Sequence, residues 1–189
     1  ANAHADSATI SFAANLSCKT LALTGGQLVL TSDVTIVGDI TGDDKADVTI
    51  SGNNASRVFK IEGSGTDVDL LSLTIANGYA NVSQGGGIWQ LGGTLDIFDT
   101  TIRDNRTTAQ LIGDGEYGGG IFSAGKLTVT DSTISGNFAY WGGGVYAGDS
   151  ATFVNTTIHG NSGTTGLNGA GGGIATGAGA SLIILNSTI

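Results

Sequence analysis

Apolar and polar residues alternate with a period of two in short segments along the chain. In residues 126–137, KLTVTDSTISGN, we expect Leu127 and Val129 to point to one side and Thr128 and Thr130 to the other. Such an alternation is typical of a β-strand with one buried face. The pattern therefore predicts short strands rather than helices.

The alternation changes phase within the same segment. The spacing from Val129 to Ile134 is odd, so a turn at Asp131–Ser132 is needed if both side chains are to face the same side. Asp and Asn suit such a turn, because their side chains bond nearby amides and tolerate the left-handed conformation. We therefore expect two strands separated by a sharp turn.

This segment recurs along the chain. When the copies are aligned on the Ile of each Thr-Ile pair, this residue falls at Ile36, Ile50, Ile75, Ile102, Ile134, Ile158 and Ile189. An Asn follows three positions later in four copies, at Asn53, Asn105, Asn137 and Asn161. Glycine triplets followed by Ile or Val stand at 85–87, 118–120, 142–144 and 171–173. Only the distance from the Asn to the next triplet varies widely, so each repeat is one unit with insertions at a single corner.

A unit this short cannot bury its apolar side alone. Stacking the units at about 4.8 Å would pair each backbone group with the units above and below. The sequence therefore predicts an all-β fold, a right-handed parallel β-helix (β-solenoid) with three short strands per coil and about six to seven coils. The glycine triplets are interpreted as structural, since Gly tolerates positive φ at a sharp bend and allows close packing between coils. Residues 1–24 are expected to form an N-terminal cap or entry strand, and residues 25–189 the β-helix of a longer protein.

The repeats resemble those of polymorphic outer-membrane proteins and related bacterial surface β-helices, which pair a GG-A-I type motif with an F-x-x-N type motif. The matching segments are GGGI at 85–88, 118–121 and 171–174, GGGV at 142–145, IRDN at 102–105, ISGN at 134–137 and IHGN at 158–161. Ile stands where the family has Phe, so the chain is more similar to the wider group of bacterial surface β-helices than to the polymorphic outer-membrane proteins themselves. The resemblance covers roughly residues 25–189 and implies export and adhesion, but no chemistry.

The charge of the chain argues against one class of partner. The net charge is −9 and only seven residues are Lys or Arg, which argues against nucleic acid because phosphate binding needs a basic face. No apolar run reaches the length that spans a membrane. Cys18 is the only cysteine, so no internal disulfide can form, and we expect its thiol to be buried.

The acidic segment 38–50, GDITGDDKADVTI, is a candidate calcium site. Its D-x-T-x-D-x-x-x-D spacing resembles calcium loops, in which positions 1, 3, 5 and 9 turn oxygens inward and position 7 offers a carbonyl. The ligands of a structural Ca²⁺ on this pattern are Asp39, Thr41, Asp43, Lys45 (through its backbone oxygen) and Asp47. Asp44 departs from the pattern where such loops prefer Gly, and a distal bidentate Glu is missing. The alternative is a solvated acidic turn between two strands.

Aromatic residues gather near the variable corner of the repeats. A candidate contact patch for a glycan or a protein consists of Tyr117, Tyr140, Trp141 and Tyr146. The alternative is that these rings cover the open corner of the solenoid.

Catalytic motifs are not evident. Arg103 and His159 share one outward column, but no constellation resembles the site of a polysaccharide lyase or a polygalacturonase. We therefore expect a non-catalytic, structural or adhesive β-helix segment of an exported bacterial protein, outside the cell or associated with the outer membrane. Its partner would be a surface protein or glycan of a host or neighbouring cell, or copies of itself. Two alternatives stay open: an extracellular filament subunit that stacks head to tail, and a carbohydrate-binding or carbohydrate-active β-helix.

Overall fold

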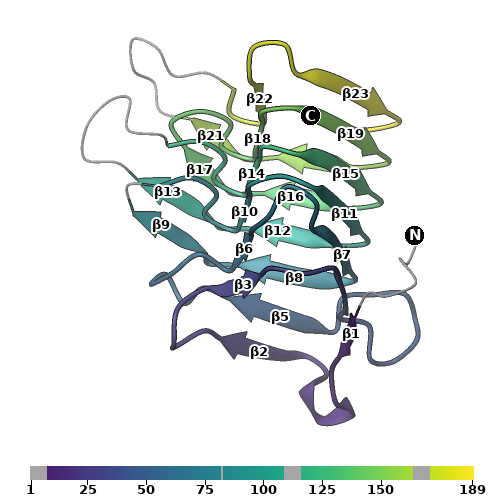
Figure 1. Ribbon diagram of the computed structural model, residues 1–189. Coiled ribbons are helices and arrows are strands. Elements are labelled where there is room, and N and C mark those ends of the chain that lie inside the picture. The colour runs from purple at the N-terminus through teal and green to yellow at the C-terminus, as the bar shows by residue number, and fades with distance from the viewer. Residues whose placement is uncertain (1–7, 82, 109–115, 164–170) are drawn as a thin grey trace.

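The computed structural model describes residues 8–81, 83–108, 116–163 and 171–189. Within these ranges the chain forms short β-strands and one 3₁₀ turn, η1 (Ala14–Leu16), and the strands stack into a right-handed parallel solenoid (Figure 1). Each coil of the solenoid pairs only with the coils before and after it.

Four parallel sheets run along the solenoid. Sheet I contains β1 (Ala8–Ser11), β4 (Val34–Val37), β7 (Asp67–Leu71), β11 (Thr94–Phe98), β15 (Lys126–Thr130), β19 (Ser150–Val154) and β23 (Ser181–Leu185). Sheet II contains β2 (Lys19–Ala22), β5 (Val48–Ser51), β8 (Leu73–Ala76), β12 (Thr101–Arg103), β16 (Thr133–Ser135) and β20 (Thr157–His159). Sheet III contains β9 (Tyr79–Asn81), β13 (Arg106–Thr108), β17 (Phe138–Ala139) and β21 (Ser162–Gly163). Sheet IV contains β3 (Leu28–Leu30), β6 (Phe59–Ile61), β10 (Ile88–Gln90), β14 (Ile121–Ser123), β18 (Val145–Ala147) and β22 (Ile174–Thr176).

This architecture confirms the predicted right-handed parallel β-helix. The three expected strands of each coil lie in sheets I, II and IV, and the chain passes through these sheets in that order. Sheet III adds a fourth, short strand to four of the coils, which the sequence analysis did not predict. Within the expected cap of residues 1–24, β1 and β2 already pair with β4 and β5, so these residues contribute strands to sheets I and II.

The core is a set of columns in which like residues stack from coil to coil. One column of sheet I is at most 1% exposed and contains Leu70, Ile97, Val129 and Phe153. The next column, in sheet II, is equally buried and contains Ile75, Ile102, Ile134 and Ile158. In the last strand, β23, the corresponding Leu182 and Ile184 are 38% and 39% exposed, because the described residues place no coil over them.

The turn from sheet I to sheet II has the predicted left-handed conformation. One residue per coil has φ between 47° and 51° at this turn, in the column Ser72, Asp99, Asp131, Asn155 and Asn186. Hydroxyl groups at the next position satisfy the turn backbone: Ser132 Oγ accepts the N–H of Thr100 (3.0 Å) and donates to the carbonyl of Thr130 (2.7 Å).

A ladder of buried asparagines closes the turn from sheet II to sheet III. Asn137 Oδ1 accepts the backbone N–H of Asn105 (2.9 Å), and Asn137 Nδ2 donates to the carbonyl of Ile102 (2.9 Å). Asn161 repeats this arrangement one coil further on. The grouping of Asn53 with this column was wrong, because Asn53 is exposed in the left-handed region (φ 54°), whereas Asn105 and Asn137 are fully buried.

The glycine triplets have the structural role that the sequence analysis gave them. The first glycine of each triplet has a φ between 60° and 66°, at Gly85, Gly118, Gly142 and Gly171. The second and third glycines lie backbone against backbone with the neighbouring coils, as where Gly119 N–H donates to the carbonyl of Gly142 (3.2 Å). The triplets therefore bend the chain into sheet IV and permit the closest approach between coils.

Candidate functional sites

The acidic loop between β4 and β5 brings three predicted calcium ligands together. Carboxylate oxygens of Asp39, Asp43 and Asp47 lie within 4.8 Å of one another. Asp43 is exposed, and Asp39 and Asp47 are half-buried. A cluster of this size could supply oxygens to a hard cation such as Ca²⁺.

Backbone amides of the loop hold two of these carboxylates in place. Asp47 Oδ2 accepts the N–H groups of Ile40 and Thr41, both at 2.8 Å, and these bonds lower the pKa of Asp47. Asp39 accepts the N–H groups of Gly42 (2.7 Å) and Asp44 (3.0 Å). Asp44, the departure from the calcium-loop pattern, itself adopts the left-handed conformation at φ 58°. The loop is thus folded around its own carboxylates.

The other two predicted ligands make polar contacts with Asp43. Thr41 Oγ1 donates to Asp43 Oδ1 (2.9 Å), and Lys45 Nζ forms an ion pair with Asp43 Oδ2 (3.1 Å). Both contacts lower the pKa of Asp43, the bond from Thr41 more than the bond from Lys45. The Lys45 ammonium therefore binds the carboxylate that a bound metal ion would also use.

The acidic character extends from the loop to the adjacent turn column. Burial raises the pKa of Asp99, and the negative charges of Asp131, Asp44 and Asp39 raise it further, although a hydrogen bond with Ser72 opposes them. The loop thus lies close enough to the turn between sheets I and II for the negative charges of Asp39 and Asp44 to raise the pKa of Asp99.

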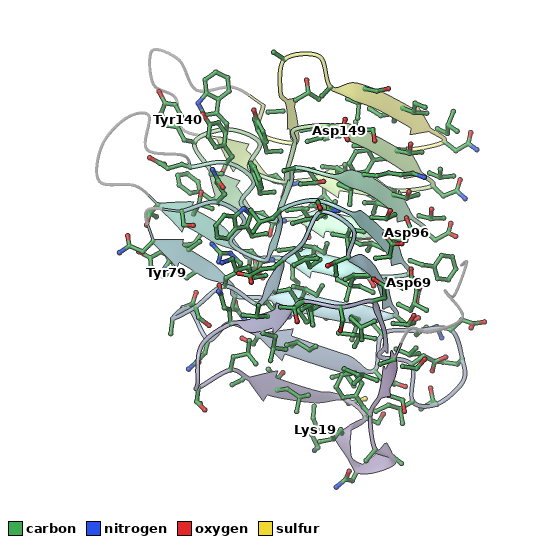
Figure 2. All side chains as sticks on the ribbon, in the orientation of Figure 1. Lys19, Asp69, Tyr79, Asp96, Tyr140 and Asp149 are labelled. Atoms are coloured by element: carbon green, nitrogen blue, oxygen red, sulfur yellow. The ribbon has the colours of Figure 1, made fainter. Side chains whose placement is uncertain are left out.

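A groove of about 550 Å³ lies on the outer face of sheet I. Asp96 of β11 stands directly beside Asp69 of β7, and Figure 2 shows both side chains on the same flank of the solenoid. Thr35 Oγ1 donates to Asp69 Oδ2 (3.0 Å) and so orients that carboxylate. Around this pair the groove is lined by Leu71, Ile97, Phe98, Lys126, Thr128 and Thr130.

An apolar column borders the two carboxylates. Leu71 and Phe98 are neighbours in the strand register, and Phe98 is 43% exposed although it belongs to the middle of the sheet. The sequence analysis did not predict this groove. Its signal was present in the last outward position of the sheet I strands, which is apolar in five of the six strands from β4 to β23: Val37, Leu71, Phe98, Val154 and Leu185.

The predicted aromatic contact patch separates into two packed groups. The rings of Tyr117 and Tyr146 lie 4.5 Å apart, and Tyr146 stacks on Phe122 at 5.5 Å with an interplanar angle of 2°. Burial, and next the proximity of Tyr117, raise the pKa of Tyr146. Phe122 covers a face of Tyr146 and Tyr117 packs against both rings at an angle, which favours the alternative that these rings cover the corner of the solenoid.

Tyr140 and Trp141 form the second group, with ring centroids 6.1 Å apart. Tyr140 is only 6% exposed, so it offers little surface to a contact patch. Trp141 pairs with Tyr117 through an isolated parallel bridge, which aligns the two residues in adjacent coils.

Two further single-residue expectations have clear outcomes. Cys18 is exposed rather than buried, and it occupies a left-handed turn (φ 58°) before β2 in the first coil. Arg103 and His159 do share one column of sheet II with Ser135 between them, and Arg103 forms an ion pair with the adjacent Asp104 (2.7 Å).

Comparisons with known proteins address the fold. No helix among the described residues is long and apolar enough to span a bilayer. No match was found among curated proteins or among solved structures. The family described as right handed beta helix region matches residues 35–189, which include most strands of the four sheets. The chain therefore belongs to the right-handed β-helix family.

Proposed function

We propose that this chain is a non-catalytic adhesive segment of an exported bacterial surface protein, related to the polymorphic outer-membrane proteins, and that it binds a neutral glycan along sheet I. The groove beside Asp69, Asp96 and Phe98 carries this proposal. Its side chains stand on paired strands, so the surface is rigid and needs little ordering when a ligand binds.

The chemistry of the groove fits sugar hydroxyls. The carboxylates of Asp69 and Asp96 accept hydrogen bonds, the hydroxyl of Thr128 both donates and accepts, and the exposed ring of Phe98 offers an apolar face. Equivalent groups recur at the strand spacing of about 4.8 Å, which suits an extended polymer. The net charge of −9 disfavours a polyanionic glycan.

The glycan proposal predicts that two groove substitutions weaken binding. Phe98→Ala and Asp96→Asn should each weaken retardation by soluble neutral polysaccharides in affinity electrophoresis about tenfold, or about 1.4 kcal/mol. Leu91→Ala is the matched control, because Leu91 is also 43% exposed but does not line the groove. A stronger response to polygalacturonate, or an equal loss with Leu91→Ala, would contradict the proposal. Release of reducing ends from the bound polymer would contradict its non-catalytic part.

We also propose that the acidic loop holds a structural Ca²⁺ through Asp39, Asp43 and Asp47. Support comes from the convergence of the three carboxylates and from the further negative charge of Asp44 and Asp99 beside them. Calcium is plentiful outside the cell, which is where the adhesive proposal places the chain.

Calcium is expected to raise the melting temperature by binding only the folded loop. Thermal melts at neutral pH in about 10 mM calcium, which exceeds the Kd of roughly 0.1–1 mM typical of extracellular sites, and in EDTA should differ, and Asp43→Asn should abolish the difference. Asp149→Asn removes an exposed carboxylate away from the cluster and is the matched control.

Asp43 and Asp47 have pKa values below the ordinary 3.8. Their ionised carboxylates therefore stabilise the folded loop above this pH, and this stabilisation is lost as the pH falls below it. Identical melts in calcium and EDTA would show that amides and Lys45 alone hold the loop.

A further inference from the structure

Arg57, which precedes β6 of sheet IV, is only 6% exposed and binds neutral acceptors. Its Nε donates to the carbonyls of Gln84 (3.1 Å) and Gly85 (2.7 Å). Its Nη2 donates to Ser83 Oγ (2.9 Å) and to the carbonyl of Gln84 (2.7 Å), and its Nη1 donates to Gln27 Oε1. These bonds fix the plane of the guanidinium and connect three successive coils.

The charge of Arg57 has no counter-charge in the part of the chain that the structure describes. The nearby Lys60 pairs with Glu62 (2.6 Å), whereas Arg57 forms no ion pair with any described residue. Burial lowers the pKa of Arg57 to about 10, so the group stays positively charged at neutral pH. A buried charge is costly unless it is paired, which makes an isolated buried guanidinium unusual in a purely structural role.

A pocket of about 300 Å³ opens beside this guanidinium. Three of its lining residues have hydrogen-bond donors beyond those that form the bonds described above. Nη1 of Arg57 has a second N–H, Ser83 keeps its hydroxyl proton, and Gln27, whose oxygen faces Arg57, keeps its amide NH₂. Among the described residues no acidic side chain lines the pocket, and Ser56, Tyr79, Ala80 and Asn81 complete its wall.

The surroundings of the pocket are positively charged in an otherwise acidic chain. Arg57 and Lys60 lie over the ring of Trp89 at 4.6 and 4.7 Å, and Arg106 lies over the ring of Tyr79 at 4.9 Å. These are three of the seven Lys and Arg residues of a chain with a net charge of −9, and Glu62 offsets the charge of Lys60 but not that of the two arginines. The local potential therefore favours an anion, although the whole chain repels one.

We propose that the pocket formed by Gln27, Arg57 and Ser83 binds a small oxyanion, a carboxylate or phosphate group, on the guanidinium of Arg57. A planar guanidinium with a free N–H matches the oxygens of either group, and the neutral donors beside it supply further hydrogen bonds. The pocket lies at the corner between sheets III and IV, and it shares no residue with the groove of sheet I. Anion binding is thus independent of the proposed glycan site.

The two tryptophans of the chain allow a direct test. Trp141→Phe leaves Trp89, which touches Arg57, as the only tryptophan. Titration of this variant with inorganic phosphate or with glucuronate, at constant ionic strength in sodium chloride, should give a saturable change in fluorescence, and glucose should give none. The more tightly bound anion then shows whether phosphate or carboxylate is the natural group.

Substitutions in the same background decide whether Arg57 is the binding group. Arg57→Gln should raise the half-saturating concentration at least about tenfold, and Ser83→Ala about fivefold. If Arg57→Gln does not fold, Arg57→Lys keeps the cation but not the planar fork and should still weaken binding. Arg103→Gln removes an exposed cation elsewhere and should change nothing, as should Phe98→Ala in the glycan groove. The proposal is overturned if neither anion gives a saturable change, or if Ser83→Ala and Arg103→Gln behave alike.

Discussion

Replacement of Gly119 by alanine is expected to destabilise the protein by at least about 3 kcal/mol. An added Cβ would lie 2.4 Å from the carbonyl oxygen of Gly143 and 2.4 Å from that of Phe138. Both oxygens belong to backbone segments that pack against Gly119. The hydrogen bonds of sheets III and IV hold these segments in place. The neighbours therefore cannot move aside without breaking hydrogen bonds between coils.

Urea unfolding followed by far-ultraviolet circular dichroism would measure this loss. Gly65→Ala is the matched control, because nothing lies within 4 Å of a Cβ at Gly65, and its expected change is within about 0.5 kcal/mol. Equal unfolding midpoints for the two variants would mean that close approach of the coils at the triplet is not required.

Replacement of Asn137 by alanine is expected to cost about 3 kcal/mol. Asn137 is fully buried, and its loss would leave the N–H of Asn105 and the carbonyl of Ile102 without these partners. It would also remove the side-chain bonds to Asn105 (3.0 Å) and Asn161 (2.9 Å). Buried polar groups left unsatisfied carry their full desolvation penalty, which exceeds the net value of the bonds themselves.

The same unfolding measurement tests the ladder, with Asn81→Ala as the control. Asn81 is exposed at the end of β9, so its truncation should change the free energy of unfolding by less than about 0.5 kcal/mol. Similar values for the two asparagines would refute a stabilising role for the ladder.

The sequence was sufficient to predict sheets I, II and IV because their strands repeat with apolar positions in register. Sheet III was not predicted, since strands such as Phe138–Ala139 are too short to show an alternation. Asn53 fitted the spacing of the asparagine column, but spacing alone does not distinguish a buried ladder residue from an exposed left-handed turn. Periodicity thus predicts the repeated frame, and it fails where one coil departs from that frame.

The candidate sites also differ in how far the sequence predicts them. Asp39, Asp43 and Asp47 belong to one short loop, so their proximity followed from the sequence. In contrast, Gln27 and Arg57 meet only because successive coils stack in register, and neither residue belongs to a repeated motif. A contact of this kind depends on the number of residues between equivalent positions of successive coils, which the repeat pattern does not fix.

The variable corner between the asparagine ladder and the glycine triplets has a consequence for how such a protein can evolve. The ladder ends the constant part of one coil and the triplet begins the next, while the segments between them, 106–117, 138–141 and 162–170, differ in length after the short strand of sheet III with which each begins. Doubling a connection costs only about 0.6 kcal/mol in loop-closure entropy. Insertions there can change the surface without altering the strand register. New specificities can therefore arise by lengthening one loop at a time, and foreign peptides could be grafted at the same corner by design.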